Sequence, residues 1–254
     1  MPVQTSARKV AIVTGAAQGI GAAISHRLGR EGYNLALVDL ITSRAPLDKI
    51  ANSVETLGVQ VIALTADVSS EADVGEAVAQ TVQQLGRLDV MVANAGIAPV
   101  CPFLEMTPDL LDKTYAVNVR GVFLCYREAA KVMISQGQGG RLIGKCDSLR
   151  TGPNVSGYCA SKFAVRALNQ GAALEFGKHG ITANVYCPTV VETEMWEKID
   201  DEITRMQGRE KGTYTAERVP LGRNATPEDI AAMVAFLVSQ DASFVTGQAM
   251  QVTW

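Results

Sequence analysis

Residues 10–21 read VAIVTGAAQGIG, an apolar run that ends in three glycines spaced over seven positions. The β-branched residues predict a buried strand at 10–14, and a helical pattern begins at Gly19. Glycines at such a turn let backbone amides approach a pyrophosphate, which the positive end of the helix attracts. The spacing is Gly-x-x-x-Gly-x-Gly rather than G-x-G-x-x-G, and a tight turn without a ligand stays an alternative. The stretch predicts the start of a parallel α/β sheet, with Gly15, Gln18, Gly19, Ile20 and Gly21 as cofactor-binding residues.

The same alternation of strand and helix patterns continues to the end of the chain. This rhythm predicts an α/β fold, a doubly wound, Rossmann-like parallel sheet with helices on both faces. At 254 residues, one domain spanning 1–254 is expected, without a repeat or linker. The expected strands are 10–14, 34–39, 59–65, 90–93, 141–146, 182–187 and 249–252, and the expected helices are 19–31, 45–57, 71–85, 109–136, 156–178 and 227–237.

Composition and charge exclude several classes of protein. With 47% hydrophobic and 19% charged residues, the chain has the balance of a folded globular protein. A net charge of -3 without a dense Lys/Arg stripe gives no support for a nucleic-acid partner or a membrane surface. Charged residues, glycines or asparagines break the apolar runs well before the ~18 residues that a membrane span requires. A small-molecule partner is therefore expected.

Cysteines, histidines and the first residues indicate the compartment and argue against a metal. Residues 1–9 lack the apolar core of a secretory signal, which favours a cytoplasmic location. The five cysteines are odd in number and lack Cys-x-x-Cys spacing, so we expect reduced thiols. His26 and His179 have no ligand cluster around them in sequence, so no metal site is expected.

A polar stretch, 189–226, interrupts the alternation and lies between two prolines. It is too polar for the core and too long for a simple turn, and segments of this kind are often functional lids. Met195, Trp196 and Ile199 fit one face of a short helix that could close over a site. The alternative is a solvated surface loop.

Asp39 ends the second expected strand, at the sheet edge where the glycine turn also lies. A carboxylate in this place can accept hydrogen bonds from an adenosine ribose and would repel a ribose phosphate. The sequence therefore favours NAD(H) over NADP(H) as the cofactor. The alternative is that Asp39 only caps the next segment.

Further candidate residues follow the third and fourth expected strands. Asp67 and Val68 come after the third strand, and Asn94, Ala95 and Gly96 come after the fourth. Because ligands of such folds bind at the carboxyl ends of the strands, these residues are expected to line the cofactor site. Gly96 would allow a close approach of the backbone to a ligand.

Tyr158 and Lys162 lie four residues apart at the start of an expected helix. Residues at i and i+4 share a helix face, so the phenol and the ammonium would be held side by side. A nearby ammonium favours the phenolate and brings the phenol toward acid/base chemistry at neutral pH. Taken alone, the spacing is weak evidence, because Tyr-x-x-x-Lys also arises by chance, and a surface helix pair is then the favoured alternative.

With these residues assembled, the chain resembles the short-chain dehydrogenase/reductase family over nearly its whole length. Within that family, the fragments 22–24 (AAI), 161–166 (SKFAVR) and 195–196 (MW) look like acetoin reductases and 2,3-butanediol dehydrogenases. The motifs that carry the resemblance are the glycine turn, Asp67, Asn94-Ala95-Gly96, Asn118 within Val117-Asn118-Val119, and Tyr158-x-x-x-Lys162.

The resemblance implies an NAD-dependent oxidoreductase that transfers a hydride between NAD(H) and a secondary alcohol or ketone, acetoin-like or larger. Tyr158 would exchange a proton with the substrate oxygen, while Lys162 would lower the pKa of that phenol and hold the nicotinamide ribose. Asn118 would hold a water in the proton relay and interrupt its helix. The stretch 189–226 would cover the substrate, and Val191 within it would contact the cofactor. Family members are often homotetramers, so a homo-oligomer, tetramer or dimer, is expected.

The chain departs from the family pattern at the serine that hydrogen-bonds the substrate oxygen. The family usually places this serine 13 residues before the tyrosine, and here that count reaches Lys145. Counted by strand register, the position falls instead on Asp147, with Cys146 before it and Ser148 one step further. If the strand keeps its register, Lys145 and Asp147 point toward the site and Ser148 points away.

The substitution would matter for catalysis. An ionised Asp147 at ~4 Å from a developing alkoxide would cost about 4 kcal/mol at an effective dielectric near 20, or roughly 10³ in rate. The cost shrinks if Lys145 pairs with Asp147, if Asp147 is protonated, or if a bulge carries Ser148 inward as the donor. Thr189, where the family usually has glycine, and a C-terminus without the usual Asp-Gly-Gly also depart from the pattern.

Two other functions therefore remain open on the same fold. One is a biosynthetic enzyme that performs non-redox chemistry in the pocket, such as cyclisation or isomerisation. The other is a nucleotide-binding protein with impaired catalysis. We take Tyr158, Lys162, Asn118 and Ser148 as the candidate catalytic residues of the first hypothesis, the dehydrogenase.

Overall fold

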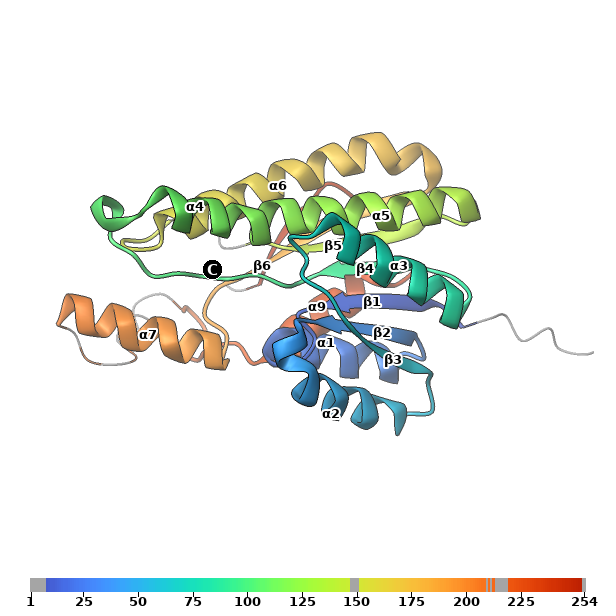
Figure 1. Ribbon diagram of the computed structural model, residues 1–254, viewed down its shortest axis with the longest axis horizontal. Coiled ribbons are helices and arrows are strands. Elements are labelled where there is room, and N and C mark those ends of the chain that lie inside the picture. The colour runs from blue at the N-terminus through green and yellow to red at the C-terminus, as the bar shows by residue number, and fades with distance from the viewer. Residues whose placement is uncertain (1–7, 147–150, 209, 211, 213–218, 253–254) are drawn as a thin grey trace, which may run out of the picture.

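The computed structural model describes residues 8–146, 151–208, 210, 212 and 219–252. Its core is a seven-stranded sheet with the order β3-β2-β1-β4-β5-β6-β7, in which every neighbouring pair is parallel (Figure 1). The predicted Rossmann-like α/β fold is thereby confirmed. The strands are β1 (Val10–Thr14), β2 (Asn34–Asp39), β3 (Val61–Thr65), β4 (Val90–Ala93), β5 (Gly140–Lys145), β6 (Ile181–Pro188) and β7 (Ala249–Val252).

Helices cover both faces of the sheet (Figure 1). One face carries α1 (Gly19–Arg30), α2 (Arg44–Glu55) and α9 (Pro227–Val238). The other carries α3 (Glu71–Leu85), α5 (Gly121–Gln136) and α6 (Ser156–Phe176). The remaining helical elements in the described part of the chain are η1 (Ile41–Ser43), η2 (Phe103–Glu105), α4 (Pro108–Tyr115), the π-helical turn η3 (Ala116–Arg120), η4 (Gly177–His179) and α7 (Glu194–Gln207).

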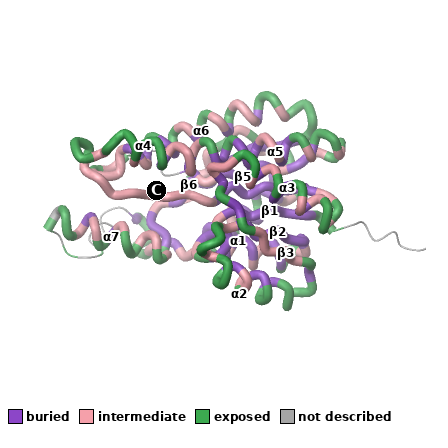
Figure 2. Tube along the Cα trace, in the orientation of Figure 1, coloured by how far each residue is buried: buried purple, intermediate pink, exposed green. Residues whose placement is uncertain are grey.

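The central strands are buried on both faces because their side chains alternate between two cores. Along β1, Val13 packs into the core under α1 and α9, whereas Ile12 packs into the core under α3 and α5. On β5, Ile143 joins the first core and Leu142 the second. Figure 2 shows the central strands buried and the outer helix faces exposed.

The predicted helix at 109–136 is interrupted where the resemblance placed Asn118. The structure divides it into α4 and α5, joined by the π-helical turn Ala116–Arg120. Such turns inside α-helices are frequent at functional sites. The interruption of this helix is therefore confirmed, and Asn118 lies buried within it.

The polar stretch 189–226 contains a helix, as predicted, but a longer one than expected. α7 has 14 residues and carries Met195, Trp196 and Ile199 half-buried. At the base of the stretch, Val191 pairs with Ala225 in a short parallel bridge, so its two ends lie side by side. α7 and α4 both extend beyond the same edge of the sheet (Figure 1). None of the described helices is long and apolar enough to cross a membrane.

Candidate active site

The glycine turn lies between β1 and α1, at the carboxyl edge of the sheet. Gly15 and Gly19 have φ angles of +65° and +52°, which favour glycine. A Cβ added to Gly21 would collide with the carbonyl oxygen of Gly15 and lie 2.7 Å from Nδ2 of Asn94. Gln18 caps α1 without a side-chain hydrogen bond and is exposed. The turn thus offers bare backbone and a helix N-terminus, which suit a phosphate group.

The side chain of Asn94 fixes this turn through hydrogen bonds. Its Nδ2 donates to the carbonyl oxygens of Thr14 at 2.8 Å and Gly15 at 3.2 Å. The backbone amides of Asn94 and Ala95 both donate to Oγ1 of Thr14 at 3.1 Å. The hydroxyl of Tyr186 donates to Oδ1 of Asn94 at 2.8 Å. Asn94 is therefore a fixed part of the scaffold. Its partners Thr14 and Tyr186 were not among the residues predicted from the sequence.

Asp39 lies at the end of β2, beside the glycine turn. Its Oδ2 accepts a hydrogen bond from the backbone amide of Ala17 at 3.0 Å, and its Oδ1 accepts one from Leu40 at 2.8 Å. The bond to Leu40 fits the capping alternative, while the bond to Ala17 ties the carboxylate to the turn. Asp39 thus has both a structural role and the position expected of a ribose-binding carboxylate.

Asp67 and Val68 shape the loop after β3. Asp67 is exposed, and its Oδ1 accepts hydrogen bonds of 2.8 Å from both the backbone amide and the hydroxyl of Ser69. Val68 is buried, and its Cγ2 would lie 2.9 Å from a Cβ added to Gly121 at the start of α5. The two residues lie at the predicted edge, and Val68 packs the loop against α5.

Tyr158 and Lys162 lie in the first turns of α6, next to the end of β5. Lys162 is only 1% exposed, which excludes the surface-pair alternative. Its Nζ donates to the carbonyl oxygen of Lys145 at 3.1 Å and lies 5.8 Å from the centre of the Tyr158 ring. The thiol of Cys146 donates to the carbonyl oxygen of Lys162 at 3.2 Å. The ammonium is thus held beside the phenol by the strand that precedes α6.

Asn118 joins the segment after β4 to the same helix. Its Oδ1 accepts from the amide of Ile97 at 2.9 Å, and its Nδ2 donates to the carbonyl of Ile97 at 2.9 Å and to Oγ of Ser161 at 3.0 Å. Ser161 in turn donates to the carbonyl oxygen of Tyr158 at 2.6 Å. The side chain therefore positions α6; the water in the proton relay stays a prediction.

Gly96 lies where these predicted residues converge. A Cβ added to Gly96 would lie 3.0 Å from Oδ1 of Asn118 and 3.3 Å from Nζ of Lys162. The structure therefore brings together three predicted residues that are far apart in sequence.

The start of α7 lies against the glycine turn. Thr193 caps α7 by accepting the amide of Trp196 at 3.2 Å, and its Cγ2 would lie 3.2 Å from a Cβ added to Gly19. Val191, two residues earlier, is buried and bridged to Ala225. Thr193 was not among the residues predicted from the sequence, although a threonine before an acidic helical run is a typical N-cap signal.

Asp147 and Ser148, the two candidates for the serine position, lie outside the described residues. Lys145, the last residue of β5, pairs in register with Tyr186, which shares the core of Ile143. Lys145 therefore lies on the side of the sheet that α1 and α9 cover. Whether Asp147 continues this register stays a prediction.

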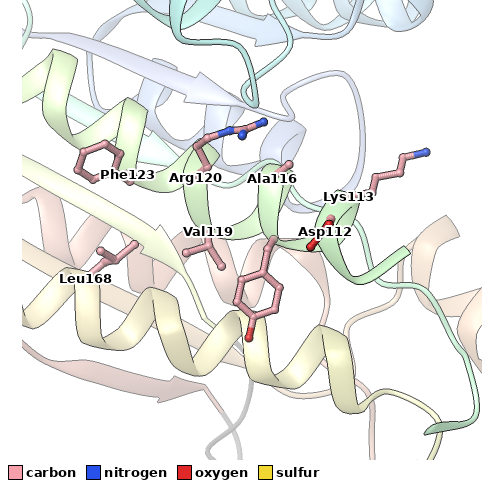
Figure 3. Close-up of a pocket in the computed structure, with 8 residues that line it drawn as sticks. Asp112, Lys113, Ala116, Val119, Arg120, Phe123 and Leu168 are labelled. Carbon is pink, nitrogen blue, oxygen red and sulfur yellow. The ribbon is translucent and has the colours of Figure 1, made fainter. Parts of the chain in front are cut away.

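A separate groove of about 710 Å³ lies on the outer side of the α4, α5 and α6 helices (Figure 3). Val119 and Leu168 point into the space between the two helices that carry them. Phe123, at its edge, is 44% exposed. The predicted site residues are absent from the described lining, which is Asp112, Lys113, Tyr115, Ala116, Val119, Arg120, Phe123 and Leu168.

Comparison with known proteins extends the similarity to nearly the whole chain. Residues 15–253 match the family model described as Enoyl-(Acyl carrier protein) reductase. A short-chain dehydrogenase/reductase from Armillaria gallica is 44% identical over 249 residues, which cover 96% of this chain and 94% of the relative. L-2,3-butanediol dehydrogenase from Corynebacterium glutamicum is 38% identical, covering 96% of each chain. Among solved structures, an NAD+-bound xylitol dehydrogenase has a TM-score of 0.91 at 30% identity, covering 96% of this chain and 97% of that one.

Proposed function

The chain belongs to the short-chain dehydrogenase/reductase family, and on that premise we propose that it is an NAD-dependent oxidoreductase interconverting a secondary alcohol and a ketone. The observation that carries the proposal is the buried ammonium of Lys162, held 5.8 Å from the Tyr158 ring by the carbonyl of Lys145. A cation fixed in this way favours the phenolate and prepares the phenol for proton transfer.

The glycine turn fits a dinucleotide. Side chains at Gly15 and Gly21 would collide with Asn94, so only glycine keeps the close packing of this turn, as a dinucleotide-binding turn requires. When bound, the nicotinamide supplies or accepts the hydride. We propose that the residues holding the cofactor are Gly15, Gln18, Gly19, Ile20, Gly21, Asp39, Asp67, Val68, Asn94, Ala95, Gly96, Tyr158, Lys162 and Val191.

The chain's own catalytic groups have different roles in the transfer of the proton. Tyr158 gives a proton to the substrate oxygen during reduction and takes it back during oxidation. Lys162 lowers the pKa of the phenol through its charge, and Asn118 keeps the segment after β4 against α6. Ser148 is the proposed donor to the substrate oxygen.

Two features support the finer choices of cofactor and substrate. The charge of Asp39 beside the turn favours NAD(H), because a ribose phosphate would be repelled. Relatives named L-2,3-butanediol dehydrogenase and diacetyl reductase, at 38% identity, favour a substrate that is acetoin-like or larger.

The segment 189–226, with α7 beside the glycine turn, is proposed to cover the substrate. The five cysteines, an odd number without Cys-x-x-Cys spacing, favour a reducing, cytoplasmic location.

The proposal is tested by following NADH absorbance with acetoin, diacetyl and a broad panel of ketones. We expect absorbance to fall with at least one ketone, and to rise when NAD+ is supplied with the matching alcohol. Flat absorbance across the panel overturns the proposal. If product forms without net change in the cofactor, the non-redox alternative, which the departure of residues 145–148 from the family's serine pattern favours, replaces it.

We also propose that the chain forms a homo-oligomer through the outer faces of α5 and α6. Phe123, which lines the groove of Figure 3, is 44% exposed on α5, and Phe163 is 45% exposed on α6. Exposed apolar side chains around a hollow are typical of interfaces. In light scattering, Phe123→Glu is expected to lower the molar mass, whereas Ile41→Glu, at another exposed apolar residue, leaves it unchanged. A wild-type monomer contradicts the proposal.

A further inference from the structure

Tyr186 places a hydroxyl in the interior of the sheet. It lies on β6, is fully buried, and belongs to the core that packs under α1 and α9. A buried hydroxyl without a partner is costly, so its hydrogen bond decides what the residue does. That bond goes to Oδ1 of Asn94, 2.8 Å away.

Asn94 connects the hydroxyl of Tyr186 to the glycine turn through further hydrogen bonds. Its amide has an acceptor at one end, which meets Tyr186, and a donor at the other, which meets the carbonyls of Thr14 and Gly15. Since the two ends are chemically different, the proton of the Tyr186 hydroxyl selects the orientation in which Nδ2 faces the turn.

Burial also determines how the hydroxyl behaves. Desolvation raises the pKa of Tyr186 well above its ordinary value of about 10, so the phenol stays protonated. It can therefore donate to Asn94 over the whole pH range of a working enzyme. A proton-transfer role is not suited to such a group, and a positioning role is.

The glycine turn has little room to absorb a shift of the carbonyls that Asn94 holds. The carbonyl of Gly15 lies against Gly21, where an added Cβ would collide with it. A displacement of Gly15 would therefore move the first turn of α1, whose free amides face the proposed pyrophosphate site.

We propose that Tyr186 is a positioning residue for cofactor binding, which acts through Asn94 on the carbonyls of Thr14 and Gly15. The inference rests on the proposed function, because the ligand of the turn is the proposed dinucleotide. Tyr186, on β6, thereby joins the residues that are proposed to determine the affinity for the cofactor.

The chain offers a matched control in Tyr126. This tyrosine is also buried, at 3% exposure, and its hydroxyl donates to an asparagine Oδ1, that of Asn169, at 3.2 Å. It belongs to the opposite core, under α5 and α6. Loss of its hydroxyl should lower stability without altering the glycine turn.

The test compares Tyr186→Phe and Tyr126→Phe with the wild type by NADH fluorescence titration and thermal unfolding. Both variants are expected to have a lower Tm. Only Tyr186→Phe should raise the Kd for NADH, by about tenfold, because the orientation of Asn94 that holds the turn would then be populated in only about a tenth of the free protein. A Kd within about twofold of wild type in a folded Tyr186→Phe protein overturns the inference.

Asn94→Ala is the second variant, because it removes the connection and leaves the phenol in place. If Tyr186 acts through Asn94, Asn94→Ala raises the Kd at least as much, and adding Tyr186→Phe to it changes nothing further. The proposed route is overturned if Tyr186→Phe raises the Kd in the Asn94→Ala background as much as it does in the wild type. It is also overturned if Asn94→Ala leaves the Kd unchanged. If the wild type itself does not bind NADH, the proposed function fails instead.

Discussion

Nζ of Lys162 donates a hydrogen bond to the carbonyl oxygen of Lys145 at 3.1 Å, joining the first turns of α6 to the last residue of β5. A buried ammonium needs such a partner, because an unpaired charge in the interior is costly. The contact leaves the charge facing Tyr158, and it makes the ammonium's position depend on the strand that leads into residues 147–150.

Replacing Lys162 by Met is expected to lower kcat/KM by about 10²- to 10⁴-fold, because the phenol loses the charge that lowers its pKa. For alcohol oxidation, in which Tyr158 must be deprotonated, the acidic limb of the pH–rate profile should move to higher pH in the same variant. Steady-state NADH absorbance between pH 6 and about 10 measures both effects. Lys178→Met, which removes an exposed lysine just beyond α6, is the control and should leave both unchanged.

Gly21→Ala is expected to abolish measurable cofactor binding, because its Cβ would collide with the carbonyl oxygen of Gly15. Titration with NADH and the midpoint of urea unfolding are the measurements. Gly75 in α3 is the matched control, since a Cβ there meets nothing within 4 Å. Gly75→Ala should raise the free energy of unfolding by about 0.5 to 1 kcal/mol and leave the Kd unchanged. Equal Kd values for Gly21→Ala and wild type would contradict the phosphate-binding role of the turn.

The sheet and the glycine turn could be predicted because their signals are local. The stretch 10–21 carries strand, turn and helix within twelve residues, and four of the predicted strands have the observed bounds. Tyr158 and Lys162 were also predictable, since helical spacing alone puts them on one face. The edges of β5 and β6 moved by a residue because pairing with neighbours, rather than composition, ends a strand.

Residues whose roles depend on distant partners could not be predicted. The hydroxyl of Tyr186 meets Asn94 across 92 positions, and nothing near either residue in sequence indicates the bond. Thr193 shows its helix cap locally, but its contact with Gly19 depends on how the whole stretch 189–226 folds back. Sequence patterns identify motifs, whereas these contacts arise only from the topology.

Asp229 predicts a pH dependence of stability. Hydrogen bonds from Arg223, at 2.6 and 3.1 Å, and from the amide of Thr226 lower the pKa of Asp229 to about 2. Because the folded pKa lies below the ordinary value of about 3.9, the stabilisation is fully present above that value and is lost as pH falls toward 2. Asp229→Asn should lower Tm at pH 6 by about 2 to 4 °C, with a smaller difference at about pH 3. A constant difference in calorimetry would contradict this.

The serine position predicts opposite results for two substitutions. If Asp147 continues the register of Lys145, Asp147→Ser restores a neutral donor and should raise kcat for ketone reduction by about 10²- to 10³-fold. Ser148→Ala should then change little. If a bulge carries Ser148 inward instead, Ser148→Ala should lower kcat by about 10²-fold and Asp147→Ser should give no gain. Rates at saturating NADH, with the Kd for NADH as the folding control, separate the two arrangements.

Asp39 is expected to determine the choice between the two nicotinamide cofactors. Asp39→Asn keeps an oxygen that can accept from the amide of Ala17, so the glycine turn should survive while the charge is lost. Without that charge, a ribose phosphate is no longer repelled, and the ratio of kcat/KM for NADP(H) to that for NAD(H) should rise at least about tenfold. Asp48→Asn, in the exposed ion pair with Arg44 on α2, removes an equal charge farther along the chain and should leave the ratio unchanged. If Asp39→Asn lowers kcat/KM for both cofactors equally, Asp39 acts only on the turn, through Ala17 and Leu40.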